Sequence, residues 1–262
     1  MNLVQRIQMK KVILLVLISI SIGFQAFSQK KKRPDSIKRY SSSLLFGANY
    51  MIKSTWNFNK NLNKWGEDSK VQPGFGSSYG LAFFWYVNNH IGIGLNPAFT
   101  TYNLKWTGLD TLAGNQVSYE SGVKFTGFDI PLYAKYMLES GAYFELGFQY
   151  GMLFSANYKS TSTKDQYVVE KNTISSWNKT YYAPIIGFGF DMYLAEDLFL
   201  NGGVRIAYGV NNMRGHDGIP LKDDGITPGP NSLLDGTLYD TKRTSHFFWG
   251  GVNVGILYRI DI

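Results

Sequence analysis

A strict alternation of side-chain type is the feature that most constrains this chain. From Phe144 to Tyr158 every even position holds Phe, Leu, Tyr, Met or Ala, whereas the odd positions are mostly Gly or polar residues. A β-strand points successive side chains to opposite faces, so a period of two indicates one bulky apolar face and one smaller, more polar face. The segment therefore predicts a long two-faced strand.

The same period recurs along most of the chain. It is clear in four further segments and weaker in three others, which brings the expected number of strands to eight. The clear segments are Phe128–Leu138, Tyr182–Leu194, Leu198–Val210 and Phe248–Ile260, and the weaker ones are Leu44–Ile52, Tyr79–Val87 and Ile91–Thr101.

The relative bulk of the two faces decides which one is enclosed. A soluble lipocalin-like barrel would turn its apolar face inward, but an eight-stranded barrel has an interior only just wide enough for side chains. The apolar face here is crowded with Phe, Tyr, Leu and Ile, whereas the other face is mostly Gly, Ala, Ser and Asn with a few charges. We therefore expect the apolar face to point outward, into lipid.

The connections alternate between short and long. Short ones are expected at 88–90, 139–141 and 195–197, and long polar ones at 53–77, 105–124, 159–179 and 211–245. This predicts an all-β fold: an eight-stranded antiparallel up-and-down transmembrane β-barrel with four long extracellular loops and short periplasmic turns.

The amino-terminal part is typical of an exported protein. Lys10 and Lys11 precede an apolar run too short for a comfortable membrane span, and small residues follow, which predicts a signal peptide over residues 1–28 cleaved after Ser28. A basic periplasmic tail then covers residues 29–40, and the outer membrane barrel domain covers 41–262. Nine of the 26 basic residues precede Ser41, so the formal charge of +7 belongs to this region and a nucleic-acid groove in the barrel domain has little support.

Two sets of residues follow from the expected topology. Rings with outward parity near the strand ends predict two aromatic girdles at the membrane interfaces: Tyr50, Tyr79, Tyr158, Tyr182 and Tyr208 at the loop end, and Trp85, Tyr136 and Tyr258 at the turn end. Charged residues with inward parity predict an interior polar network: Asp129, Lys135, Glu145, Asp191, Arg205 and Arg259. Unpaired charges would be costly there, so ion pairing should plug the barrel, and an ion path is the sharper alternative.

Part of the chain resembles a known family. The signal peptide, the Phe128–Tyr136 segment FDIPLYAKY and the Tyr143–Gly147 strand YFELG are similar to the PorT-like outer membrane β-barrel family. The resemblance implies an eight-stranded barrel of the OmpA type, without a substrate. Asn253, Gly255, Tyr258 and Ile260 resemble the terminal signal read by the barrel-assembly machinery, which would be a partner during biogenesis, although the chain ends Asp261-Ile262 rather than on an aromatic residue.

Catalytic chemistry has little support. There is no cysteine, and Ser245 and His246 would point to opposite faces of a strand, so a nucleophile and base pair is not expected. Neither a cofactor nor a metal is expected. The sequence favours a plugged outer membrane protein, in contact with membrane lipid, with a structural role or a surface-interaction role through loops 53–77 and 211–245. An accessory component of a secretion system, a narrow channel and a lipid-modifying enzyme are the alternatives.

Overall fold

The computed structural model describes residues 43–59, 69–112, 115–162, 168–174, 177–195, 197–213 and 245–261. The expected signal peptide, the basic tail and most of the connection at 211–245 lie outside these residues. The described part is built from β-strands: β1 (Ser43–Asn59), β2 (Ser69–Gln72), β3 (Gly74–Tyr86), β4 (Ile91–Leu95), β5 (Ala98–Leu112), β6 (Asn115–Met137), β7 (Ala142–Ser162), β8 (Val168–Asn172), β9 (Thr180–Ala195), β10 (Leu198–Tyr208) and β11 (Ser245–Asp261).

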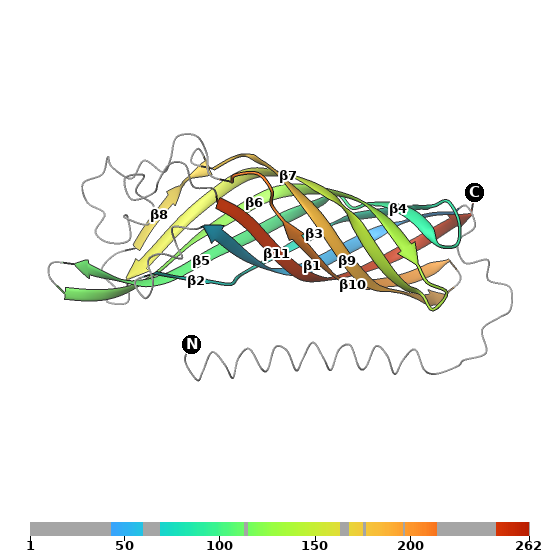
Figure 1. The fold of residues 1–262 in the computed structure, drawn as a ribbon, viewed down its shortest axis with the longest axis horizontal. Coiled ribbons are helices and arrows are strands. Elements are labelled where there is room, and N and C mark those ends of the chain that lie inside the picture. The colour runs from blue at the N-terminus through green and yellow to red at the C-terminus, as the bar shows by residue number, and fades with distance from the viewer. Residues whose placement is uncertain are drawn as a thin grey trace. The chain divides into compact units, whose positions relative to one another are not determined.

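The strands close into a ring of eight. β1 pairs with both β3 and β11, and antiparallel pairing continues around the barrel through β10, β9, β7 and β6. β4 and β5 together complete the circle between β3 and β6. β2 and β8 extend it at the loop end, where each pairs with one neighbour. Figure 1 shows the tilted strands wrapped side by side, with β11 paired to β1. The expected eight-stranded up-and-down barrel is confirmed.

A proline accompanies two of the interruptions in the strands. Pro73 separates β2 from β3, and Asn96 and Pro97 separate β4 from β5. Proline has no backbone N–H to donate to the ladder, so pairing is broken at these positions. The neighbouring groups find partners across the break, since the Asn96 amide donates to the Pro131 carbonyl at 3.1 Å.

The three short connections lie where the sequence predicts them. The first follows Tyr86, where the Asn88 side chain accepts hydrogen bonds from the backbone amides of His90 and Ile91 at 2.9 and 2.8 Å. The other two contain the positive φ angles that tight turns require, 92° at Gly141 and 61° at Asp197. All three lie at the same end of the barrel, which is called the turn end below.

At the opposite end, the loop end, three of the four expected long connections are largely continuations of the strands. β1 continues to Asn59, and β5 and β6 pair as far as Leu112 and Asn115. In these segments the backbones of neighbouring strands stay paired although the side chains are polar. The sequence analysis placed strands by apolar side chains at alternate positions, so it did not detect these extensions. Figure 1 shows the β5–β6 hairpin, in green, extending past the neighbouring strands.

The bulky apolar face points out of the barrel. Outward residues such as Leu146, Phe188 and Val252 have 55, 56 and 61% of their surface exposed, although they are large and apolar. The inward face, however, is not made only of small residues, because Tyr102, Tyr133 and many other rings fill it. Among the described residues, no helix is long and apolar enough to cross a membrane.

Inward glycines make room for these rings. A Cβ added at Gly151 would overlap the ring of Tyr181, and one added at Gly94 would overlap the ring of Tyr133. The interior therefore holds small residues, as expected, together with large rings that occupy the space beside some of them.

Candidate functional site

The barrel interior holds a polar network built on six charged side chains. Five of them are among the predicted interior residues: Asp129 and Lys135 on β6, Glu145 on β7, Asp191 on β9 and Arg205 on β10. Lys53 on β1 is the sixth. All six are at most 4% exposed, and they form three ion pairs, so the network carries no net charge.

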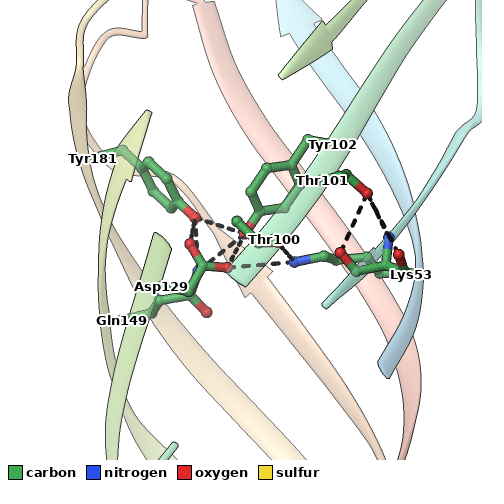
Figure 2. Close-up of polar contacts among 8 residues, drawn as sticks. Lys53, Thr100, Thr101, Tyr102, Asp129, Gln149 and Tyr181 are labelled. Atoms are coloured by element: carbon green, nitrogen blue, oxygen red, sulfur yellow. Dashed lines mark hydrogen bonds and ion pairs between the residues drawn. The ribbon is translucent and has the colours of Figure 1, made fainter. Parts of the chain in front are cut away.

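The first ion pair lies toward the loop end and joins Lys53 to Asp129. Lys53 Nζ lies 3.3 Å from Asp129 Oδ2, and the hydroxyls of Tyr102 and Tyr181 donate to the two carboxylate oxygens. Figure 2 shows the phenol groups converging on Asp129, with Gln149 reaching the Tyr181 hydroxyl at 2.8 Å. Five strands, β1, β5, β6, β7 and β9, therefore meet in one cluster, which crosses the interior.

Lys53 is the member of the network that the sequence analysis missed. It was assigned to the first residue of an expected loop, but β1 continues past it, and its ammonium lies 3.9 Å from the centre of the Tyr102 ring. Thr100 accepts a hydrogen bond from the same ammonium. A usable signal was present, because Met51, Lys53 and Thr55 share the inward parity of β1.

The second ion pair joins β7 to β10. Arg205 donates to Glu145 Oε2 through Nη2 at 2.8 Å and through Nε at 3.2 Å. The guanidinium also lies over the ring of Tyr133, with 4.5 Å between Cζ and the ring centre. The Tyr133 hydroxyl donates to Asn96 Oδ1 at 2.8 Å, which ties this pair to the break between β4 and β5. The Arg205 guanidinium is thus held by Glu145 and by the Tyr133 ring, whereas Glu145 Oε1 is buried without a hydrogen-bond partner among the described residues.

The third ion pair lies toward the turn end. Lys135 Nζ contacts both oxygens of Asp191, at 2.8 and 3.1 Å, and both side chains are fully buried. Asn201 donates to Asp191 Oδ1 at 2.6 Å and receives a hydrogen bond from Asn253 at 3.1 Å. Tyr143 lies under the ammonium, 3.8 Å from its ring centre. Buried charges need this density of partners, because each one has lost its water.

Arg259 was expected in the interior network but lies at the turn-end rim. Its Nη2 is 2.7 Å from Asp197 Oδ1, and both side chains are partly exposed. The reason is its position near the end of β11, level with the turn between β9 and β10, whose Asp197 carbonyl accepts the Arg259 amide. This fourth pair ties the last strand to a turn and does not belong to the interior network.

Apolar layers lie on both sides of the interior network. At the loop end, Phe125 packs against Trp177 and Phe247, with ring centres 4.9 and 5.2 Å apart. At the turn end the buried side chains are Leu45, Phe84, Met137, Phe199 and Leu257. The charges are therefore enclosed between two layers of packed side chains.

Seven of the eight predicted girdle residues point outward and are 41 to 60% exposed: Tyr50, Tyr79, Trp85, Tyr136, Tyr182, Tyr208 and Tyr258. The prediction for Tyr158 is wrong. Its side chain is buried, 3% exposed, and its hydroxyl donates to Ser121. The register between β6 and β7 shifts at Phe154, where an extra residue reverses the parity of everything beyond it. Burial raises the pKa of the Tyr158 phenol, against hydrogen bonds that lower it.

The proposed assembly-signal residues divide between the two faces of β11. Asn253 and Gly255 point inward, whereas Tyr258 and Ile260 point outward and are 46 and 47% exposed. An alternating arrangement of this kind follows directly from the strand period. Recognition by the assembly machinery stays a prediction.

The two histidines of the described strands and turns, His90 and His246, each contact a backbone carbonyl and a tyrosine ring. His90 Nδ1 is 2.9 Å from the Met137 carbonyl oxygen, and His246 Nδ1 is 2.9 Å from that of Gly209. Each ring stacks on an outward tyrosine, Tyr136 or Tyr208. Within the described ranges, no three His, Asp or Glu side chains gather as metal ligands would.

Comparison with known proteins identifies the family. A family model described as an outer membrane protein β-barrel domain matches residues 18–215. Similar solved structures include OprG from Pseudomonas aeruginosa, with 12% identity, coverage of 87% of this chain and 100% of that chain, and a TM-score of 0.43. They also include Ail from Yersinia pestis, with 11% identity, coverage of 84% and 99%, and a TM-score of 0.36.

The N-terminal β-barrel domain of OprF from Pseudomonas aeruginosa is a third, with 11% identity, coverage of 81% and 97%, and a TM-score of 0.32. A search of curated proteins found no match. The family match spans most of the chain and agrees with the closed ring of strands and its apolar outer face. The chain therefore belongs to the outer membrane protein β-barrel domain family and is an integral protein of the bacterial outer membrane.

Proposed function

We propose that this protein is a closed barrel, sealed against ions, that serves as a rigid support for contacts at the cell surface. The observation that carries the first half is the enclosure of three ion pairs between two apolar layers. An ion entering from either end would have to displace packed rings and then separate charges that already have partners, and both steps are costly.

The second half of the proposal is supported by the strands that continue beyond the lipid-facing band. β7 carries large outward apolar residues from Phe144 to Phe154 and then runs on to Ser162. β5 and β6 pair up to Leu112 and Asn115, further than β7 accompanies them. Strand pairs anchored in a rigid barrel can hold a surface for binding at little entropic cost.

Planar-bilayer recording tests the seal. The wild-type protein should give no steady open-channel current. Replacing Phe125 and Trp177 with Ala removes part of the loop-end layer but leaves the ion pairs, and it should raise the frequency of brief openings. A control replaces outward Phe188 and Phe148 with Ala, which also removes two rings but does not touch the interior. Steady current through the wild-type protein would refute the seal.

Hairpin shortening tests the surface role. Replacing residues 109–118 with a two-residue turn removes the tip of the β5–β6 hairpin but leaves the described barrel pairing intact. In a deletion strain, the shortened protein should fail to restore adhesion or detergent resistance while reaching the membrane in normal amounts. Full restoration by the shortened protein would exclude this hairpin as the surface that matters. A secretion defect in the same strain would instead favour the accessory role in secretion.

A further inference from the structure

The loop end of the barrel interior concentrates buried polar atoms that lack hydrogen-bond partners. Within the part of the chain that the structure describes, nine buried side-chain nitrogen or oxygen atoms make no hydrogen bond, and five of the nine lie in this region. They are the indole Nε1 atoms of Trp106, Trp177 and Trp249, together with Thr55 Oγ1 and Asn57 Oδ1. A buried indole N–H normally has an acceptor, because leaving it unpaired costs free energy. We name these five residues the loop-end cluster.

Strand pairing places three members of the loop-end cluster side by side. Thr55 on β1 is paired with Trp249 on β11, and Asn57 lies two residues further along the same face of β1. Directly paired residues of neighbouring antiparallel strands have Cβ atoms about 5 Å apart. All three side chains are at most 6% exposed. Their unpaired atoms are therefore within reach of one small molecule.

Aromatic rings flank these unpaired atoms. Phe247 is paired with Asn57, and its ring centre lies 6.2 Å from that of Trp177. Phe125 contacts both of these rings, with centres 5.2 Å from Phe247 and 4.9 Å from Trp177. Trp106 on β5 supplies a third indole and is 5% exposed. The region thus combines ring faces with hydrogen-bonding atoms that have no described partner.

The first ion pair bounds this region on the side of the membrane centre. Lys53 Nζ lies 5.2 Å from the centre of the Trp249 ring, and Asp129 balances its charge at 3.3 Å. No member of the loop-end cluster carries a charge. A charged ligand would have no opposite charge in the cluster to pair with, so burying it there would be costly. The chemistry of the cluster favours a neutral ligand.

The kinds of unpaired atom narrow the ligand further. Indole N–H groups only donate, the Thr55 hydroxyl both donates and accepts, and Asn57 Oδ1 only accepts. The ligand must therefore offer several acceptors and at least one donor in a small volume. Each hydroxyl of a sugar is both donor and acceptor, and the C–H face of a sugar ring packs against aromatic rings. A peptide group offers one donor and one acceptor only, so it satisfies fewer of these atoms.

Trp177 covers the cluster from a connection and not from a strand of the ring. It lies between β8 and β9, and its amide donates to the Ile174 carbonyl at 3.2 Å. The next residue is tied to the segment that follows β10, since the Asn178 amide donates to the Met213 carbonyl at 2.8 Å and its side chain donates to the Asn212 carbonyl at 2.9 Å. Few hydrogen bonds must break for Trp177 to move aside, which opens a route from the loop end.

From this arrangement we infer that the loop-end cluster binds one neutral sugar residue, which enters from the loop end. Thr55, Asn57 and Trp249 hydrogen-bond its hydroxyl groups, and the rings of Phe247 and Trp177 pack against its C–H face. The inference goes beyond the proposed function, because the site does not include the β5–β6 hairpin. A bound sugar also leaves the three ion pairs closed beneath it, so the seal and the sugar site can fail separately.

Nuclear magnetic resonance of the indole N–H groups tests the inference on the full chain in detergent micelles, labelled with ¹⁵N in its tryptophans. The probes are the methyl glycosides of glucose, galactose and mannose, added up to about 0.1 M so that millimolar dissociation constants are detected. The Trp177 and Trp249 resonances should shift saturably with at least one of these sugars. The resonances of Trp56 and Trp85, whose side chains have outward parity, should not shift.

Two variants locate the binding. Thr55→Val removes a hydroxyl that has no described partner, and Trp177→Phe removes an indole N–H but keeps a ring; each should weaken sugar binding by about fivefold. Trp85→Phe makes the same change on the outward face and should leave the dissociation constant unchanged. Far-UV circular dichroism and heat-modifiable gel mobility establish that each variant is folded.

Every other outcome overturns the inference. It fails if none of the three sugars shifts the Trp177 and Trp249 resonances, which would mean that internal water alone satisfies the cluster. It fails equally if the outward indoles shift as much as the inward ones, or if Thr55→Val and Trp177→Phe bind sugar as tightly as the wild-type protein. A neutral blocked peptide, N-acetylglycine amide, is the last probe, and stronger shifts with it than with the sugars would assign the site to a peptide.

Discussion

Replacing Asp191 with Asn isolates what a buried ion pair contributes to this barrel. The substitution keeps the size and shape of the side chain, so Asn201 still has an oxygen to donate to. It removes the charge that faces Lys135, whose ammonium is fully buried and lies 2.8 Å from Asp191 Oδ2. Removing one partner of a buried pair typically costs about 3–5 kcal/mol, because the other charge stays behind without compensation.

The structure places the expected loss near the lower end of that range. In the variant, the Lys135 ammonium keeps its position over two rings, 3.8 Å from the centre of Tyr143 and 4.5 Å from that of Phe84. Such contacts contribute up to about 2 kcal/mol for a desolvated cation. We therefore expect the free energy of unfolding to fall by about 3 kcal/mol. Adding Lys135→Met removes the stranded charge and should restore stability to within about 1 kcal/mol of wild type.

Urea unfolding in phosphatidylcholine vesicles, followed by tryptophan fluorescence, measures both differences. Lys135→Met alone completes the double-mutant cycle, and it should be as destabilising as Asp191→Asn because it leaves the carboxylate unpaired. The reasoning is refuted if Asp191→Asn costs less than about 1 kcal/mol, or if the double variant is no more stable than the single one. Either result would mean that Lys135 and Asp191 are stabilised mainly by groups other than their ion-pair partner.

Other substitutions test separate parts of the structure. Gly151→Ala should lower the free energy of unfolding by about 1–3 kcal/mol in the same assay, since the added Cβ would overlap the Tyr181 ring. In the Gly151→Ala background, Tyr181→Ala should cost less than it costs in the wild-type protein. Leu146→Arg should cost about 2–4 kcal/mol if that face meets lipid, whereas Asn157→Arg, above the apolar band, should change stability by less than about 1 kcal/mol; equal costs would contradict the assigned band. Tyr158→Phe should lower the free energy of unfolding by about 1 kcal/mol through the lost hydrogen bond to Ser121. Surface iodination of the wild-type protein should leave Tyr158 unmodified, and rapid iodination of Tyr158 would contradict its inward position.

The strand period determined the fold because it depends only on local geometry. Alternation over residues 144–154 placed Leu146 outside and Glu145 inside, and the structure agrees with both positions. It also located the three turns, where the apolar period stops. The period failed at Tyr158 because a single extra residue at Phe154 reverses the faces, and nothing in the alternation of neighbouring residue types marks that insertion.

By itself, then, the amino-acid sequence determined that eight two-faced strands close with their bulky side outward, since bulk and parity are properties of each strand alone. Only the tertiary structure decided which charges meet, because a partner such as Lys53 for Asp129 lies on a different strand and is chosen by register across the ring. It also decided that rings fill the interior, since the Tyr181 ring lies where Gly151 on the neighbouring strand leaves space for it. Pairing and packing of this kind depend on distances between residues far apart in the chain, which no local pattern records.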